Sequence, residues 1–165
     1  MNLDRYTELA KKIFFDAMET AKAMQNQALT TGHLAKTILS QDKKRLKKAV
    51  ESCGGNFSII LNDLDKAMKI IPKVKGHENL YVDKDLQLAM VDSDHLSKKY
   101  GDKYIGIDAL LMAIAFGKCS VGKLFKKNLT SLKDFETNSA SNRKEKKIEN
   151  QQYEEGMSIL EKYTV

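Results

Sequence analysis

The segment whose residues are best suited to chemistry is Gly-Lys-Cys-Ser-Val-Gly-Lys-Leu at positions 117–124. Its first seven positions match the phosphate-binding loop G-x-x-x-x-G-K-[ST], in which backbone amides and the lysine hold phosphates. The eighth position, which should supply a hydroxyl to magnesium, is Leu124. The segment also follows an apolar helical pattern, whereas a phosphate loop follows a β-strand. We therefore expect no nucleotide or magnesium site in this chain.

The histidines and cysteines lack the spacing of a metal site, because no C-x-x-C or H-x-x-x-H pattern is present. Nothing in the sequence brings a histidine near Cys119 to act as its general base. The four aspartates within 83–94 lack the spacing of a calcium loop, and Asp83 is more simply a helix N-cap. We expect no metal and no catalytic residue, and structural or surface roles for His33, His77, His95, Cys53 and Cys119.

The formal net charge of +6 is a feature shared with proteins that bind nucleic acids. The densest basic run is 43–48, but Leu46, Ala49 and Val50 recur at helical spacing. This spacing places the lysines on the outer face of an amphipathic helix. No aromatic residue lies among them to stack on bases. We expect no nucleic-acid partner, and a basic helical nucleic-acid-binding protein is a remote alternative.

The sequence contains no segment typical of a membrane or secreted protein. Its longest apolar stretch, 109–116, is too short to cross a bilayer, and residues 1–5 include no apolar signal region. Two cysteines far apart in the sequence do not indicate a disulfide framework. We expect a soluble cytoplasmic protein with no membrane partner.

Apolar residues recur with a period of 3.6 in nearly every segment, which predicts an all-α fold. Capping residues, glycines and Pro72 set the helix limits. The predicted helices are listed here in chain order: a first that begins at Asp4 or Thr7 and ends at 24, a second that is capped by Thr30 or Thr31 and ends at about 39, 43–53, a fourth that begins near Asn56 or Ser58 and ends at 71, 83–100, 107–116, 121–128 and a short stretch capped by Thr130. The fourth helix is expected to bury Leu61, Leu64, Met68 and Ile71. The fifth is expected to bury Leu86, Ala89, Met90, Ser93, Leu96 and Tyr100.

The helical pattern of 14–39 recurs when it is shifted forward by 76 positions, with Leu34 over Leu110 and Ile38 over Ile114. After a slip of one residue the match resumes, and Leu124 falls opposite Ala49, a core position. We predict a first four-helix repeat at 1–71, a connecting loop at 72–82 and a second four-helix repeat at 83–136. Such units bury their apolar faces by packing together, and the seam between them is a natural binding site.

The character of the sequence changes at Thr137, where a polar stretch is followed by the charge run RKEKK at 143–147. This composition is typical of a linker. A last helix is predicted at about 148–163. We interpret 137–165 as a linker that leads toward a further domain absent from this chain.

Four segments resemble the ClpB/Hsp104 protein disaggregases: MNLDRYTE at 1–8, IPKVKG at 71–76, KYGDKYI at 99–105 and LEKYTV at 160–165. They occur in the family's order and spacing across essentially the whole chain. The resemblance implies the N-domain of a hexameric AAA+ chaperone that disaggregates proteins with the Hsp70 system. It implies that this chain is not itself an enzyme, and that ATP and magnesium bind to downstream ATPase domains. The N-domain would bind apolar segments of unfolded or aggregated clients and pass them to the hexamer pore.

The resemblance also implies which residues bind clients. Thr7, Asp102 and Asp108 match positions that mark the family, lie at predicted helix ends and are expected to face a common surface. Met90 and Leu96 are the apolar candidates for a client groove between the repeats. Each of these residues also has a structural interpretation, as a cap, a turn former or a core side chain.

Two positions depart from the family pattern: Asp92 and Ala109 stand where an apolar and a larger residue are common. Both would make the groove smaller or more polar. The alternative within the same family of folds is the N-domain of a ClpA/ClpC-type protease-partner unfoldase, which docks adaptor proteins instead of clients. The opening and closing segments favour ClpB.

Overall fold

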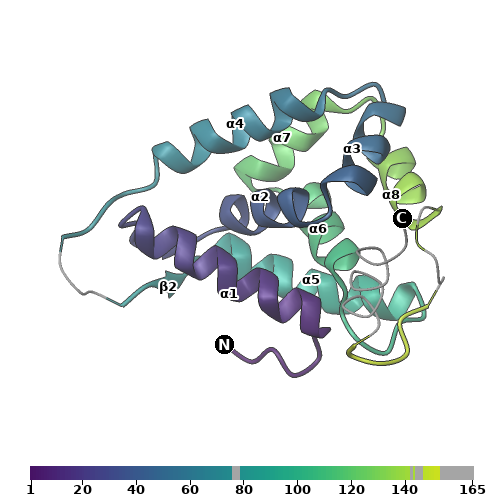
Figure 1. Ribbon diagram of the computed structural model, residues 1–165, viewed down its shortest axis with the longest axis horizontal. Helices are drawn as coiled ribbons and strands as arrows, with labels where there is room; N and C mark the ends of the chain where they lie inside the picture. Colours follow the sequence, from purple (N-terminus) through teal and green to yellow (C-terminus); the bar gives the residue numbers. More distant parts are fainter. Residues whose placement is uncertain (76–78, 142, 144–146, 153–165) are drawn as a thin grey trace, which may run out of the picture.

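A computed structural model describes residues 1–75, 79–141, 143 and 147–152, and these form eight α-helices and two very short strands (Figure 1). The all-α prediction is confirmed. In chain order the elements are α1 Glu8–Ala23, β1 Ala28–Leu29, α2 Thr31–Gln41, α3 Lys43–Ser52, α4 Phe57–Lys69, β2 Tyr81–Val82, α5 Lys84–Lys99, α6 Ile107–Phe116, α7 Ser120–Asn128 and α8 Leu132–Ser141.

The helix ends of the first half repeat in the second half with the predicted shift. Helix α1 begins at Glu8 and α5 at Lys84, a difference of 76. Their N-caps are also equivalent, because Thr7 accepts a hydrogen bond from the Ala10 amide and Asp83 accepts one from the Leu86 amide. Local capping chemistry therefore sets both helix starts in the same way.

The predicted slip of one residue is present in the last helix of each half. The Asn56 side chain accepts a hydrogen bond from the Ile59 amide, and Ser131 accepts one from the Asp134 amide, which is a shift of 75. The predicted cap Thr130 is wrong by one residue. Its hydroxyl donates instead to the Cys53 carbonyl at 2.6 Å, so it joins the two halves.

The two halves also pair with each other in equivalent ways. Strand β1 pairs in parallel with β2, with Leu29 opposite Val82, and Tyr6 forms a parallel bridge with Ile105. Under the shift of 76, Tyr6 is equivalent to Val82 and Leu29 is equivalent to Ile105. The Tyr6–Ile105 contact is therefore the repeat equivalent of the Leu29–Val82 contact. Contacts of this kind are typical of a two-fold relationship. The segment 72–82, expected to be a loop, therefore contains a short strand.

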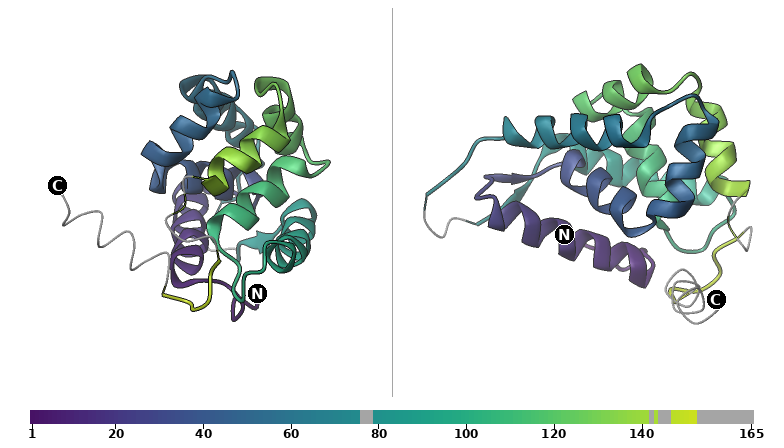
Figure 2. Two further views of the ribbon diagram at one scale, coloured as in Figure 1. Left: turned by 90° about the vertical axis from the view of Figure 1, so that its right-hand side faces the viewer. Right: turned by 45° about the horizontal axis from the view of Figure 1, so that its top comes forward.

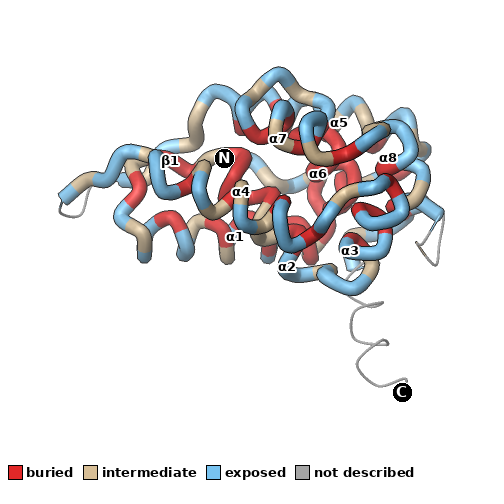
Figure 3. The backbone as a smooth tube through the Cα atoms, turned by 90° about the horizontal axis from the view of Figure 1, so that it is seen from above, coloured by how far each residue is buried: buried red, intermediate tan, exposed pale blue. Residues whose placement is uncertain are grey.

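The helices form three layers, seen in Figures 1 and 2 as α1 and α5 below, α2 and α6 in the middle, and α3, α4, α7 and α8 above. Helix α6 is buried from Ile107 to Ala115 because its sequence, apart from Asp108, is apolar on all sides. One cluster of buried side chains includes members of both halves. Figure 3 shows buried residues along the helices of both halves. No described helix is long and apolar enough to cross a membrane.

The buried faces of α4 and α5 differ slightly from the predicted ones. In α5 the fully buried residues are Leu86, Ala89, Ser93 and Ser97. Met90, Leu96 and Tyr100, which were predicted to be buried in α5, are only half-buried. Leu61 and Ile71, predicted to be buried in the fourth helix, are also half-buried. Small polar residues such as Ser97 occupy the centre of the buried face of α5. A prediction from hydropathy alone therefore selects the larger apolar residues on either side of this face.

The boundary expected at Thr137 is wrong, because α8 continues to Ser141. Ser139 is only 1% exposed and stands where the repeat places the buried Leu64. A serine at this core position removes the apolar signal of a helix. Residues 148–152, expected to be helical, form no helix, and 153–163 of that prediction lie outside the described residues.

Candidate functional site

A cluster of charged side chains joins the two halves at one end of the molecule. We call Arg45, Asp102, Asp108 and Arg143 the ionic cluster. The Arg45 guanidinium donates to both carboxylate oxygens of Asp108, from Nη2 at 2.6 Å and from Nη1 at 3.1 Å. It also donates to Asp42 at 2.6 Å and to the Ser139 carbonyl at 2.8 Å. One arginine of α3 thereby holds α6 and α8 in place.

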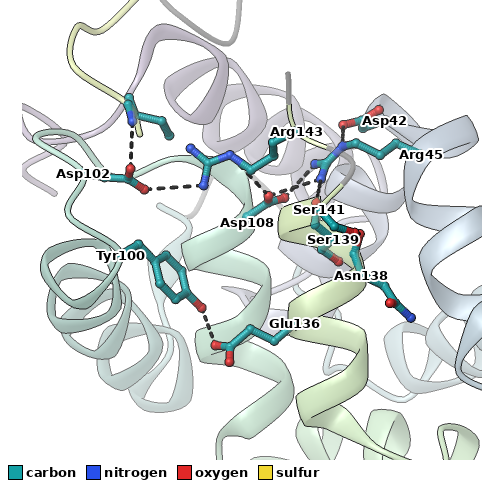
Figure 4. A network of polar contacts seen from close by, with 11 residues as sticks. Asp42, Arg45, Tyr100, Asp102, Asp108, Glu136, Asn138, Ser139, Ser141 and Arg143 are labelled. Atoms are coloured by element: carbon teal, nitrogen blue, oxygen red, sulfur yellow. Dashed lines mark hydrogen bonds and ion pairs between the residues drawn. The ribbon is translucent and has the colours of Figure 1, made fainter. Parts of the chain in front are cut away.

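Arg143 lies between the two carboxylates of the ionic cluster (Figure 4). Its guanidinium is 3.6 Å from Asp102 Oδ2 and 3.9 Å from Asp108 Oδ2. The other oxygen of Asp102 accepts a hydrogen bond from the Ile148 amide at 2.7 Å. The side chains of Asp102 and Asp108 are only 1% and 9% exposed, so these pairs are largely removed from water.

Burial and charge pairing oppose each other in this cluster. Burial disfavours the charged form of Arg45, but the carboxylates of Asp108 and Asp42 raise its pKa above the usual value. Burial raises the pKa of Asp102, and the Ile148 amide and the Arg143 charge partly offset this rise. Both carboxylates thus depend on their cationic or amide partners.

A pocket of about 190 Å³ opens beside the ionic cluster, lined by Tyr100, Asp108, Met112, Glu136, Ser139, Ala140 and Arg143. The Tyr100 hydroxyl donates to Glu136 at 2.5 Å. Burial and the neighbouring Glu136 carboxylate raise the pKa of Tyr100. This tyrosine is therefore a neutral hydrogen-bond donor at physiological pH.

The ionic cluster breaks the symmetry of the repeat. Asp108 is equivalent to Gly32 by the shift of 76, and Arg143 is equivalent to Met68 by the shift of 75. In the first half these positions form an apolar contact, because a Cβ on Gly32 would lie 3.4 Å from Met68 Cγ. The second half has an ion pair in its place. The cluster is consequently a feature added to the repeat rather than one required by it.

Thr7, Asp102 and Asp108 lie at one end of the molecule, but all three are buried. The Thr7 amide donates to the Ile105 carbonyl in the loop between α5 and α6, close to Asp102. Thr7 caps α1, Asp102 accepts the Ile148 amide, and Asp108 pairs with Arg45. The three residues hold elements together, and their side chains do not form an exposed common surface.

Met90 and Leu96 lie on opposite flanks of the buried stripe of α5, about 120° apart around the helix axis. Both are half-buried and pack against the core. They therefore do not line the same side of a groove. Of the two departures noted above, Asp92 is exposed and Ala109 is buried.

Exposed apolar side chains that the sequence analysis did not single out lie on α1 and α5. Phe15 is 62% exposed, Leu88 54% and Val91 55%. Phe15 and Val91 are equivalent in the repeat. Comparing the two helices at the shift of 76 would have identified this pair, since both lie off the buried stripes.

The segment that resembles a phosphate loop connects α6 to α7. Cys119 caps α7 through its sulfur, and the Lys126 ammonium donates to the Gly117 carbonyl at 2.6 Å. A Cβ at Gly122 would lie 2.3 Å from the Gly117 oxygen. Close backbone packing therefore explains this glycine without a phosphate. Leu124, expected in the core, is half-buried.

The remaining candidates for chemistry have structural or surface positions. The lysines of α3 are exposed while Leu46, Ala49 and Val50 are buried, as the amphipathic pattern predicts. His33 and Cys53 are buried, His95 is exposed and His77 lies outside the described residues. Within the described part of the chain, no group of three or more histidine, cysteine or acidic residues is arranged to hold a metal.

Comparison with known proteins places this architecture among chaperone domains. The family model of the Clp repeat (R) N-terminal domain matches residues 5–128. Chaperone protein ClpB of Rickettsia bellii is 27% identical over 165 residues, an alignment that covers 99% of this chain and 19% of the relative. ClpB of Brucella suis is 29% identical over 119 residues, covering 72% and 14%. The chain thus spans about a fifth, or less, of the length of these relatives.

Solved structures show the same fold. The Hsp104 N-terminal domain from Candida albicans matches with a TM-score of 0.76 and 20% identity, covering 90% of this chain and 98% of that one. The N-terminal domain of the caseinolytic protease associated chaperone ClpD from Arabidopsis thaliana matches with a TM-score of 0.62 and 13% identity, covering 86% and 96%.

Proposed function

Because this chain belongs to the Clp repeat N-terminal domain family and is an N-domain of the ClpB/Hsp104 type, we propose that it binds apolar segments of non-native client proteins. The chain corresponds to the N-terminal repeat domain of these chaperones and not to an ATPase domain. In this proposal it captures clients, and other domains of a longer protein supply the mechanical work.

The observation that carries the proposal is the pair of equivalent exposed side chains Phe15 and Val91. They lie on α1 and α5, which together form one layer of the molecule. Leu88 adds a third exposed apolar side chain on α5. Apolar side chains that are free to contact a partner suit weak binding of unfolded segments with little sequence preference.

The five residues implied by the family resemblance keep their proposed role, in two groups. We propose that Met90 and Leu96 contribute their exposed parts on either flank of α5. Thr7, Asp102 and Asp108 would act indirectly as long as their side chains are engaged within the domain.

We extend the proposal to the longer protein on the basis of its ClpB relatives. It would form a hexamer, bind ATP and magnesium in further domains, and act with an Hsp70 system in the cytoplasm. The N-domain would deliver clients to the central pore.

Client binding can be tested with the purified chain and a permanently unfolded protein, carboxymethylated α-lactalbumin. We expect the double variant Phe15→Ser, Val91→Ser to bind it about thirtyfold more weakly, since the two lost contacts together remove about 2 kcal/mol of apolar burial. The matched control is Ile59→Ser, Ile70→Ser, which removes two side chains of α4 and its C-cap that are 50% and 83% exposed. Equal weakening by both double variants would contradict a specific surface on α1 and α5.

Adaptor docking is the second candidate, favoured by the fold shared with the ClpD domain. An adaptor-docking domain would not bind the unfolded client measurably. Nucleic-acid binding is distinguished by salt, because counterion release lowers such affinity by orders of magnitude between 50 and 200 mM salt, as estimated for about six to ten phosphate contacts. We expect the client affinity to change little over this range.

A further inference from the structure

Residues 147–152, which we call the strap, follow α8 and run from the turn after α5 to the start of α1. Its contacts with the domain are mostly made by its backbone. The Ile148 amide donates to Asp102 at 2.7 Å, and the Ile148 carbonyl accepts from the Lys103 amide at 2.8 Å. The Gln151 carbonyl accepts from the Glu8 amide at 2.9 Å. The Gln151 side chain donates to the carbonyls of Asp4 and Tyr6 at 2.9 and 3.2 Å.

One apolar side chain anchors the strap. Ile148 is only 1% exposed, yet it does not belong to the main cluster of buried side chains. The neighbouring side chains at 147, 149, 150 and 152 are exposed. The strap is thus held by one isoleucine, a few backbone hydrogen bonds and the Gln151 amide, which are contacts that many sequences can make.

In the first half of the molecule, an extended segment binds to the equivalent turn in a similar way. There the Gln27 amide donates to the Pro72 carbonyl at 3.0 Å, and the Val74 amide donates to the Gln25 carbonyl at 2.9 Å. Residues 25–27 are equivalent to 101–103, so each half holds an extended segment along this turn. The position of Asp102 is taken in the first half by Asn26, whose Oδ1 pairs with His33 instead. The charged acceptor for the extended segment is therefore particular to the second half.

We propose that the strap occupies a binding site for an extended client segment with one apolar side chain, and that a client takes its place. This inference rests on the proposed client-binding function. It adds that the strap regulates one client-binding site by occupying it. When the strap leaves, the Asp102 carboxylate, the amides of Lys103 and Glu8, and the surface that buries the Ile148 side chain become available. These groups recognise an extended backbone and an apolar side chain without reading a sequence.

The proposal explains why Asp102 is buried although the family resemblance marks it as client-binding. Arg143 and the Ile148 amide compensate the Asp102 charge while the strap is in place. A client backbone amide would supply the same hydrogen bond to Asp102 when it replaces the strap. The site is consequently self-occupied in the absence of a client, and its apparent affinity is lowered by the fraction of time the strap is bound.

Hydrogen exchange of the full chain, with and without carboxymethylated α-lactalbumin, tests the proposal. We expect a saturating client to increase exchange of the Ile148 amide while the amides of α6 keep their protection. Ile148→Glu should release the strap, so that the Lys103 and Glu8 amides exchange faster. It should also tighten client binding about tenfold if the strap is bound for nine-tenths of the time. Glu149→Gln, at the exposed neighbouring position, is the control and should change neither quantity.

The outcomes separate the two proposals. If the client binds but the Ile148 amide stays equally protected, or if Ile148→Glu releases the strap without tightening binding, the shared site is wrong and the client binds elsewhere. If neither the wild type nor the released variant binds the client, the proposed client-binding function is wrong. The proposed competition between strap and client is then wrong as well. Should Ile148→Glu expose the α6 amides, Ile148→Ser replaces it, because serine removes the apolar anchor of the strap without introducing a charge.

Discussion

At the scale of single residues, the buried polar side chains define the neutral and charged forms that the fold requires. His33 is fully buried, and its Nδ1 accepts a hydrogen bond from the Thr30 amide at 3.0 Å. The proton must then be on Nε2, which donates to Asn26 at 2.9 Å. A proton on Nδ1 would face the Thr30 amide, which is itself a donor. Burial lowers the pKa of His33 to about 4, so the folded state contains the neutral ring.

His33 should make the stability depend on pH in a defined window. The unfolded chain binds a proton near pH 6.5 and the folded chain near pH 4, so stability is full above 6.5 and falls as the pH is lowered toward 4. We expect this term to reach about 2 to 3 kcal/mol at pH 4. The measurement is urea unfolding of wild type and His33→Gln, in which glutamine can keep the capping box with Thr30.

The difference between the two unfolding profiles isolates the histidine, because Asp83 and Asp102 titrate in both proteins. A difference that stays constant from pH 7 to 4 would show that His33 is not the responsible group.

At the scale of elements, the ends of α1 and α5 show how the two copies of one helix have diverged. Two residues after the last residue of each helix, the backbone has a positive φ, 58° at Gln25 and 77° at Gly101. The second copy has glycine, which adopts this conformation freely, whereas the first has a side chain that makes it strained. The glycine of the second copy therefore indicates a substitution that should make the first copy more stable.

Replacing Gln25 by glycine should stabilise the domain by about 0.5 to 1 kcal/mol, because relief of the left-handed strain exceeds the added entropy of the unfolded chain. Denaturant unfolding measures the change. Gln87→Gly is the matched control within α5, where glycine should destabilise by about 1 kcal/mol. Destabilisation at both sites would refute the interpretation of Gln25 as strained.

At the scale of the whole molecule, Arg45 joins the two halves through charge. It extends from α3 of the first half to Asp108 on α6 and to the Ser139 carbonyl on α8. Its side chain is only 17% exposed. Removing it would leave Asp108 with the more distant Arg143 as its cationic neighbour in the ionic cluster. Such a loss is costly because a buried charge loses its close partner.

Arg45→Met should therefore destabilise the domain by about 3 kcal/mol in urea unfolding. Lys47→Met on the same helix removes a charge whose side chain is 54% exposed and should change stability by less than about 0.5 kcal/mol. Similar values for the two variants would mean that the ion pair across the halves adds little to stability.

The sequence by itself determined the helical class, most helix limits and the duplication. These features depend on local capping groups and on apolar periodicity, which are readable along the chain. The shift of 76 was visible in the sequence before the caps Thr7 and Asp83 confirmed it. The amphipathic interpretation of the α3 lysines also held, because one helix face decides it.

Only the tertiary structure decided how the polar residues are used. Asp108 meets Arg45 across 63 positions of sequence, and Asp102 meets Ile148 across 46. No local pattern encodes such pairs, since they depend on how the helices pack. For the same reason the end of α8 could not be predicted from the sequence. Ser139 is buried because neighbouring elements pack around it, and not because it is hydrophobic. Burial and pairing of charges are properties of the packed molecule, and they decide which carboxylates a partner can reach.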